Sequence, residues 1–498
     1  MNTIPTREQF FELAKQGNLI SVSTIVSMDA VTPITAYSNL RLKGGYSFLL
    51  ESAERTGQIG RYSFVGRSPY AIFRSNGRTI TITENGRTRT FQTERTPLDE
   101  LKAFMAQFNY VSVPGLPEFS GGAVGYMGYD VVRFFEPTML EAAEKDELNI
   151  PEMIYMIAKE VIVFDHLTRR LHIIYNSCIR NGNAEEAYAN AYEKIDQTRF
   201  FLGAPTYLPM IDLASNAPEI QINSNTTKER FCEMVARVKE FINAGDIFQV
   251  VLSQRLSTPY TRDPLELYRS LWMENPSPYM FCIEFGNELS LVGSSPEVNV
   301  KAINGRVNIR PIAGTRGRGR TPEEDLNLER ELLADPKERA EHVMLVDLAR
   351  NDIGRIAEFG SVKVTQMFEI ERFSRVMHIV SNVVAKLRPE FDAYDVMRLS
   401  FPAGTVSGAP KIRAMQIIRD FEGNKRGAYS GAVGYFGFDG NMDSCIALRT
   451  VVLKNGTAYV QAGAGIVADS VPENEYEECI KKARAMILAI ARTQLMEV

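Results

Sequence analysis

Asn-Gly dipeptides at residues 76–77, 85–86, 304–305 and 455–456 indicate β-hairpins, and the segment Thr79–Ile82 beside the first pair alternates polar and apolar residues. Asn and Gly both tolerate positive φ, so an Asn-Gly pair favours a two-residue hairpin turn. Hairpin strands mixed with helices are typical of an α+β protein. We therefore expect an α+β fold with largely antiparallel β-sheets packed together, helices on the outside, and an active-site cleft between sheets and helices.

A change of character divides the chain near its middle. The segment Phe201–Thr227 contains Pro205, Pro209 and Pro218 and ends in a polar run. Such a segment predicts a boundary, and we expect one domain over residues 1–215 and a second over residues 225–498. Around it we expect helices over Thr6–Gln16, Ala184–Thr198 and Lys228–Asn243, and strands over Met153–Phe164 and Leu171–Tyr175.

One segment has an internal echo: residues 121–130 (GGAVGYMGYD) resemble residues 430–439 (SGAVGYFGFD). Two interpretations stand. The glycines allow other backbones to approach two separate strands, or the echo marks a duplicated sheet edge.

Composition excludes several classes of protein. The formal charge is −5, which disfavours general nucleic-acid binding. No apolar run approaches the ~18 residues that cross a bilayer. The cysteines, Cys178, Cys232, Cys282, Cys445 and Cys479, are scattered and never spaced C-x-x-C. They are typical of reduced thiols in the cytoplasm.

Two acidic helices are candidates for a metal site. Pro472 suits a first helical turn, and Glu475, Glu478 and Lys482 fall on one face of the helix that follows. A second helix begins at Pro336 and includes Glu341. Solvated helix surface is the ordinary explanation for such runs, but Mg²⁺ needs only one or two carboxylates besides water and ligand oxygens.

Three glycine-rich segments are candidates for anion binding, at residues 311–320, 401–411 and 463–468. The first two lack the Gly-Lys-[Ser/Thr] ending of a P-loop. The third matches G-x-G-x-x-A, but too little chain follows for a second βα unit. We expect it to form a short glycine turn that binds a carboxylate through backbone N–H groups.

Single polar residues in strand-like surroundings complete the candidates. Glu297 follows the strand-like run Leu289–Val292 and is expected at a strand end facing a cleft. His378 lies in an apolar run, where a core histidine is the ordinary explanation. Arg449 ends another apolar run, and a buried Arg needs an anion from the protein or from a ligand.

Taken together, these motifs resemble the chorismate-utilising enzymes, most closely their anthranilate synthase component I branch. The resemblance rests on DIFQVVLS (246–253), SPE (295–297), PIAGT (311–315), EHVMLVDLARND (341–352), residues 429–435 and 463–466, and the Glu475–Glu478 helix. It implies conversion of chorismate and ammonia to anthranilate and pyruvate, the first step of tryptophan biosynthesis.

The resemblance also implies a site. One Mg²⁺ would be held by Glu341 and Glu478, with Glu475 near its waters. Glu297 would protonate the departing C4 hydroxyl, His378 would assist loss of the C2 proton, and Thr405 would add a hydroxyl to the catalytic group. The implied substrate contacts are Gln249, Gly314, Thr315, Tyr429, Arg449, Gly463, Gly465 and Lys482.

Two positions separate relatives within this resemblance. Family members that add water carry lysine where this chain has Gln249, and the folate-branch relatives commonly carry lysine where it has Ala313. The first difference favours ammonia over water as the nucleophile, and the second favours anthranilate. An aminodeoxychorismate synthase component and a catalytically silent tryptophan-binding regulator stay open as alternatives.

The resemblance finally implies regulation and a partner. Feedback tryptophan would contact Glu51, Ser52, Pro276, Tyr279, Met280, Val433 and Tyr435. The ammonia would come from glutamine through a separate glutamine amidotransferase subunit (anthranilate synthase component II), because no Cys here has the setting of a glutaminase nucleophile.

Overall fold

The computed structural model describes residues 2–53, 60–139, 145–179, 182–212, 215–372 and 376–496. Its strands form two large, almost entirely antiparallel sheets. In sheet order, the first sheet comprises β12 (Asn223–Ser224), β13 (Gln249–Pro259), β25 (Thr457–Ile466), β24 (Thr450–Lys454), β15 (Ser290–Ser295), β14 (Tyr279–Phe285), β2 (Tyr46–Glu51), β3 (Tyr62–Arg67), β10 (Glu160–Asp165), β11 (Arg170–Cys178), β1 (Leu19–Ser27) and β7 (Tyr110–Val111), with β21 (Gly408–Ala409) paired to β13.

The second sheet has the same style of pairing. In sheet order it comprises β18 (Ile312–Gly317), β20 (Val376–Lys386), β17 (Arg306–Ile309), β16 (Val298–Ile303), β23 (Met442–Ile446), β22 (Ala432–Gly437), β8 (Gly122–Met127), β9 (Met153–Ile157), β4 (Ala71–Asn76), β5 (Thr79–Glu84) and β6 (Arg87–Gln92), with β19 (Lys363–Arg372) paired to β20.

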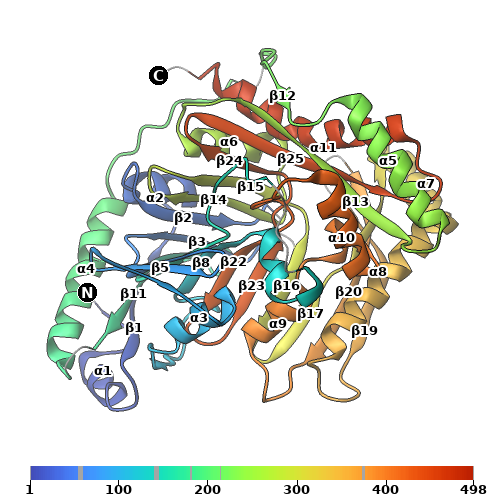
Figure 1. Ribbon diagram of the computed structural model, residues 1–498. Coiled ribbons are helices and arrows are strands. Elements are labelled where there is room, and N and C mark those ends of the chain that lie inside the picture. The colour runs from blue at the N-terminus through green and yellow to red at the C-terminus, as the bar shows by residue number, and fades with distance from the viewer. Residues whose placement is uncertain are drawn as a thin grey trace.

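Helices cover the outer faces of both sheets (Figure 1). They are α1 (Arg7–Leu13), α2 (Pro33–Leu40), α3 (Pro97–Met105), α4 (Ala184–Leu202), α5 (Lys228–Asn243), α6 (Pro264–Glu274), α7 (Pro322–Ala334), α8 (Pro336–Gly354), α9 (Ala393–Ser400), α10 (Lys411–Glu422) and α11 (Pro472–Thr493), with short 3₁₀ turns η1 (Tyr129–Phe134), η2 (Pro137–Met139) and η3 (Gly404–Val406).

The core has layers that match this arrangement. Between the sheets, side chains from both inner faces pack together, including Phe48 and Phe281 of the first sheet and Tyr126 and Val433 of the second. Separate buried clusters lie between each sheet and its helices. The predicted α+β fold, with sheets packed together and helices outside, is confirmed.

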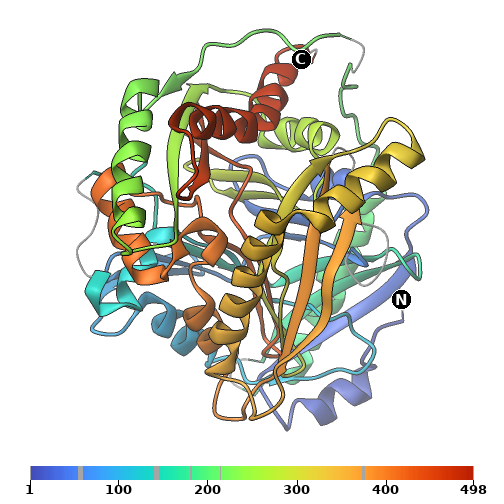
Figure 2. The same ribbon diagram turned by 90° about the vertical axis from the view of Figure 1, so that its right-hand side faces the viewer.

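The predicted helices are present, with ends that their caps explain. Thr6 caps α1 through a reciprocal capping box with Gln9. Pro336 and Pro472 occupy the first turns of α8 and α11. Figure 2 shows α8 running beside strands β19 and β20. The described part of the chain contains no helix with the length and apolar run that a bilayer crossing requires.

One predicted strand was wrong. We expected a single strand over Met153–Phe164, but the chain forms β9 in one sheet and β10 in the other, with Ala158 and Lys159 between them. The continuous run of apolar residues arises because both strands are buried. Hydrophobicity alone cannot reveal where a chain passes from one sheet to the next.

The internal echo marks a duplicated topology. The two echoing segments contain β8 and β22, which pair with each other so that Gly125 lies opposite Gly434. Outward from the central β2–β14 pair, β3, β10, β11 and β1 on one side match β15, β24, β25 and β13 on the other. The glycines also serve close approach, since a Cβ on Gly434 would lie 2.1 Å from the Asp443 carbonyl oxygen.

Both sheets run without interruption through strands from the two halves of the chain, at β2–β14 and at β8–β22. Each sheet therefore joins the two predicted domains. Their division into residues 1–215 and 225–498 stays a prediction.

Candidate active site

The candidate active site is built on two neighbouring chain crossings between the sheets. One crossing, from β15 to β16, contains Glu297, and the other, from β23 to β24, contains Arg449. The Ile446 amide donates to the Glu297 carbonyl at 3.0 Å, and the Ser294 amide donates to the Arg449 carbonyl at 3.1 Å. The backbone thus fixes the predicted acid and the predicted cation side by side, with Glu297 directly after a strand end as expected.

The environment of Glu297 favours the protonated form of its carboxyl group. Burial raises its pKa to about 7, although Thr405, Lys482 and Arg449 each favour the charged form. The Thr405 hydroxyl oxygen is buried, makes no hydrogen bond of ordinary geometry with the described residues, and lowers the pKa of Glu297. A carboxylic acid with this pKa suits proton donation near neutral pH.

His378 lies beside the PIAGT segment because β18 and β20 pair. Its Nδ1 is 2.9 Å from the Gly314 carbonyl oxygen and 3.1 Å from the Thr315 hydroxyl oxygen. A carbonyl only accepts, so the neutral ring carries its proton on Nδ1 and its lone pair on Nε2. Burial and the nearby Arg449 cation lower the pKa of His378, against the effect of the Gly314 bond.

The backbone around Gly314 explains why glycine is needed there. Gly314 has a φ of +68° and lies where the pairing of β18 with β20 shifts register. The glycine-rich segment at 311–320, a predicted candidate for anion binding, includes strand β18 at the end of its sheet.

The third glycine-rich segment, residues 463–468, was predicted as a turn, and that prediction was wrong. Gly463 and Gly465 lie inside β25, which pairs with β13 through both positions. A Cβ on Gly463 would lie 2.8 Å from the Tyr429 hydroxyl oxygen, and a Cβ on Gly465 would lie 2.8 Å from Gln249 Nε2. β25 therefore carries no side chain at the two positions where Tyr429 and Gln249, both predicted substrate contacts, approach it.

The predicted metal ligands come from α8 and α11. Burial raises the pKa of Glu341, and the neighbouring Glu338 adds to the effect. Burial also raises the pKa of Glu475, where Glu478 contributes in the same direction. Lys482 opposes both shifts, so the Glu341 and Glu475 carboxyls lie within its electrostatic reach.

The polar contacts of these carboxylates bear on whether a cation fits. Lys482 Nζ is 2.7 Å from Glu478 Oε1 and donates to the Gly463 carbonyl at 3.1 Å. Gln249 Nε2 donates to Glu341 Oε1 at 3.4 Å. Within the described ranges, no three His, Cys, Asp or Glu side chains converge as a metal cluster. The carboxyls of Glu341 and Glu475, whose pKa values are raised and which both lie within the electrostatic reach of Lys482, still fit Mg²⁺, which takes its remaining ligands from water and substrate.

The residues predicted to contact tryptophan come together at the join between the halves. Glu51 lies opposite Met280 in the β2–β14 pair, and the Ala53 amide donates to the Ser277 carbonyl at 3.1 Å, which brings Ser52 close to Pro276. The hydroxyl of Tyr279 donates to Asp443 at 2.9 Å. In the other sheet, Tyr435 and Val433 lie opposite Asp443 and Cys445, and Tyr435 packs in the inter-sheet core.

Sequence reasoning missed three residues that support the site. Asn275 accepts from Arg449 Nη1 at 3.1 Å, and the buried pair Arg426–Glu422 lies under Tyr429. Glu422 and Arg426 are four residues apart across a helix end, a spacing that usually indicates a solvated surface pair. Only the full burial of Arg426 distinguishes them.

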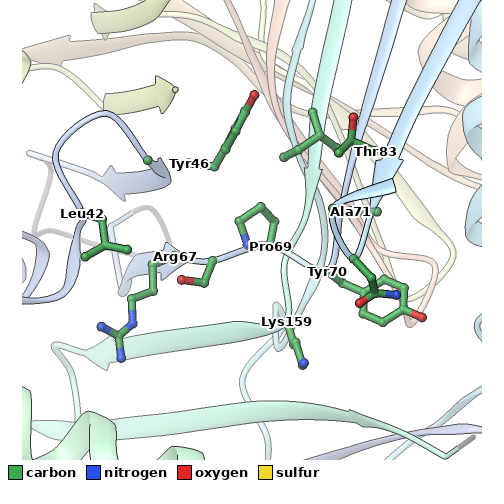
Figure 3. Close-up of a pocket in the computed structure, with 13 residues that line it drawn as sticks. Leu42, Tyr46, Arg67, Pro69, Tyr70, Ala71, Thr83 and Lys159 are labelled. Atoms are coloured by element: carbon green, nitrogen blue, oxygen red, sulfur yellow. The ribbon is translucent and has the colours of Figure 1, made fainter. Parts of the chain in front are cut away.

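The matching place in the N-terminal half lacks this chemistry. There Arg67 pairs with Glu160 at 3.2 Å and donates to the Leu40 carbonyl at 3.1 Å. A cavity of about 350 Å³ lies beside the β3–β4 crossing, lined in part by Tyr46, Tyr70 and Lys159. Figure 3 shows the Arg67 and Lys159 side chains pointing away from Tyr46. The residues that line this cavity include no carboxyl group and no histidine.

Comparisons with known proteins point to one family. The model of the chorismate binding enzyme family matches residues 45–488. Anthranilate synthase component 1 of Acetivibrio thermocellus is 47% identical over 494 residues, covering 98% of each chain. The crystal structure of anthranilate synthase component I from Streptococcus pneumoniae superposes with a TM-score of 0.75 at 38% identity, covering 93% of this chain and 99% of that one.

A more distant likeness shows the fold alone. The menaquinone-specific isochorismate synthase from Escherichia coli has a TM-score of 0.72 at 17% identity, covering 97% of this chain and 98% of that one. On the family match and the full-length identities, the chain belongs to the chorismate binding enzyme family, in its anthranilate synthase component 1 branch.

Proposed function

We propose that this protein converts chorismate and ammonia to anthranilate, pyruvate and water, the first step of tryptophan biosynthesis. The observation that carries the proposal is the protonatable carboxyl group of Glu297, buried between two chain crossings within reach of Arg449, Lys482 and Thr405. The comparisons with anthranilate synthase component 1 proteins support the substrate and the product.

In the first step, ammonia forms a bond to C2 of chorismate while the C4–O bond breaks. Glu297 donates its proton to the leaving hydroxyl, which departs as water. No base is needed to activate ammonia, and Gln249, whose amide faces Glu341, is neutral. Arg449 and Lys482 favour the carboxylate that Glu297 becomes.

In the second step, the C2 proton is removed, the C3–O bond breaks and the ring becomes aromatic. The enolpyruvyl group leaves as the enolate and takes up a proton to become pyruvate. His378 is the candidate base, because its Nδ1–H is held by the Gly314 carbonyl and its lone pair is on Nε2. Its lowered pKa keeps the ring neutral and able to accept a proton near pH 7.

Glu341 and Glu478 would hold Mg²⁺, with Glu475 beside them. The ion, when bound, supplies positive charge that retains the ring carboxylate of chorismate and relieves the repulsion between these carboxylates. The substrate's other anionic groups would meet Lys482, Tyr429 and the open backbone of β25.

Tryptophan would inhibit by binding beside Glu51 and Met280, where the two halves join. A chain of hydrogen bonds supports coupling from there to the site: Ala53 to Ser277, Asn275 to Ser277 at 3.3 Å, and Arg449 to Asn275 at 3.1 Å. A ligand that displaces one link would move Arg449, which is the requirement for allosteric coupling. A glutamine amidotransferase subunit, bound in the cytoplasm, would supply the ammonia.

The test is incubation of the purified chain with chorismate, Mg²⁺ and ammonium at mildly alkaline pH. We expect blue anthranilate fluorescence and release of one pyruvate per chorismate, both abolished by EDTA. A product that keeps its enolpyruvyl group would instead identify an aminodeoxychorismate synthase, and no loss of chorismate would refute catalysis.

A further inference from the structure

Arg426 and Glu422 form a buried ion pair beneath the candidate site. Arg426 is 1% exposed, and its guanidinium donates to both Glu422 oxygens, at 2.9 and 2.7 Å. A charge pair in such a place loses hydration, so its presence calls for contacts that apolar side chains could not make.

The remaining donors of Arg426 bind backbone from two separate segments. They reach the Val406 carbonyl at 2.8 Å and the Val251 carbonyl at 2.7 Å. Val406 follows Thr405 in the η3 turn, and Val251 lies two residues after Gln249 in β13. One side chain therefore links two predicted site segments that are far apart in the sequence.

Glu422 extends the same network to the bare strand β25. Its Oε1 accepts from both the amide and the hydroxyl of Ser253, each at 2.8 Å. Ser253 lies opposite Gly463 in the β13–β25 pair and accepts from Gln461 at 2.8 Å. The Glu422 carboxylate thus links the end of α10 to β13, next to the part of β25 where the substrate is proposed to bind.

The aromatic ring of Tyr429 packs on the same cation. The Arg426 guanidinium lies 5.5 Å from the centre of this ring. Arg426 also donates to the Ser430 hydroxyl at 3.3 Å. Since the Tyr429 hydroxyl approaches Gly463, the ion pair sets the distance between the ring and the strand.

We propose that the Arg426–Glu422 pair is a positioning element of the chorismate site, which fixes Thr405, Tyr429 and the β13–β25 surface relative to Glu297. The role rests on the proposed function. Arg426 does not touch the reacting atoms; it acts through the groups that it holds. Lysine cannot replace it, because a single ammonium cannot serve a bidentate carboxylate and two separate carbonyls.

The experiment compares Arg426→Lys and Glu422→Gln with wild type in ammonia-dependent anthranilate formation. The matched control is Arg41→Lys, since Arg41 is also buried and bridges Asp263 and Glu284 away from the site. We expect the two site variants to lose on the order of 10²-fold in kcat/KM through misplacement of bound substrate. The control variant should keep the wild-type value.

The pH profile separates positioning from general destabilisation. The groups acting on Glu297 are Thr405, Lys482 and Arg449, and Thr405 lowers its pKa. Displacement of Thr405 should raise that pKa, so the alkaline limb of kcat should move to higher pH in Arg426→Lys and stay fixed in Arg41→Lys.

Each outcome of these measurements supports or overturns the positioning role. If Arg426→Lys keeps the kcat/KM and pH profile of wild type, the positioning role is overturned. If Arg426→Lys fails to fold, Glu422→Gln decides by the same two measurements, and failure of both to fold would mean a purely structural pair. An inactive wild-type protein would refute the proposed function, and this role with it, whereas an active wild type leaves the variants to test the role alone.

Discussion

Replacing Glu297 by glutamine should have opposite effects on activity and stability. The carboxyl group has a pKa of about 7 against an ordinary value of 4.5, chiefly because it is buried. The folded state therefore holds the proton more tightly than the unfolded state does. The wild-type protein loses stability as pH rises from about 4.5 towards 7, and the loss is complete above pH 7.

The difference between the two pKa values fixes the size of this effect. At 1.36 kcal/mol per pH unit, the ionised carboxyl costs the folded protein about 3 kcal/mol above pH 7. Glutamine has the same shape and no charge to lose. With an unfolding entropy of roughly 1 kcal/mol/K for a chain of this length, Glu297→Gln should raise Tm by about 3 °C at pH 8.5 relative to its effect at pH 4.5.

The assay is thermal unfolding of both proteins at the two pH values, followed by circular dichroism, with kcat/KM measured alongside. Activity should fall by ~10²–10⁴-fold, because a positioned acid contributes about that much. Glu284→Gln is the control, since Glu284 is buried against Arg41 at 2.8 Å and its removal should destabilise. A Tm difference for Glu297→Gln that does not change with pH would refute the reasoning.

Three further predictions follow from the site. Gly463→Ala would place a Cβ 2.6 Å from the Leu252 carbonyl oxygen, so urea unfolding should show a loss of about 1–3 kcal/mol and the KM for chorismate should rise; an unchanged KM would contradict the placement of chorismate on β25. Glu341→Gln should raise the Mg²⁺ concentration for half-maximal activity by more than about tenfold, and an unaltered Mg²⁺ titration would exclude it as a ligand. Glu51→Gln should raise the tryptophan concentration for half-inhibition by about tenfold, or ~1.4 kcal/mol, with kcat unchanged; equal inhibition curves would remove Glu51 from the inhibitor site.

The chain crossings show best what sequence patterns leave undecided. Glu297 was predicted at a strand end, and Arg449 as a buried cation in need of an anion. That both lie on adjacent crossings depends on β15, β16, β23 and β24 belonging to two different sheets. For the same reason, β9 and β10 were predicted as one strand: the sequence pattern does not show where the chain passes from one sheet to the other.

The predicted turn at Gly463 and Gly465 was wrong for a related reason. Gly463 and Gly465 match the spacing of a turn, but ten residues of β25 pair with β13 and carry them through as strand. Pairing partners distant in sequence decided their conformation.

The sequence by itself determined the hairpins, several of the helices, the α+β class and, through its motifs, the family and the residue types of the site, because turn chemistry, caps and periodicity act within a few residues. Only the tertiary structure decided which of those residues meet, that the two halves repeat one topology, and that Arg426 is a buried hub instead of a surface side chain. Burial and charge coupling arise from elements far apart in the sequence: burial raises the pKa of Glu297, and Thr405, Lys482 and Arg449 oppose that shift.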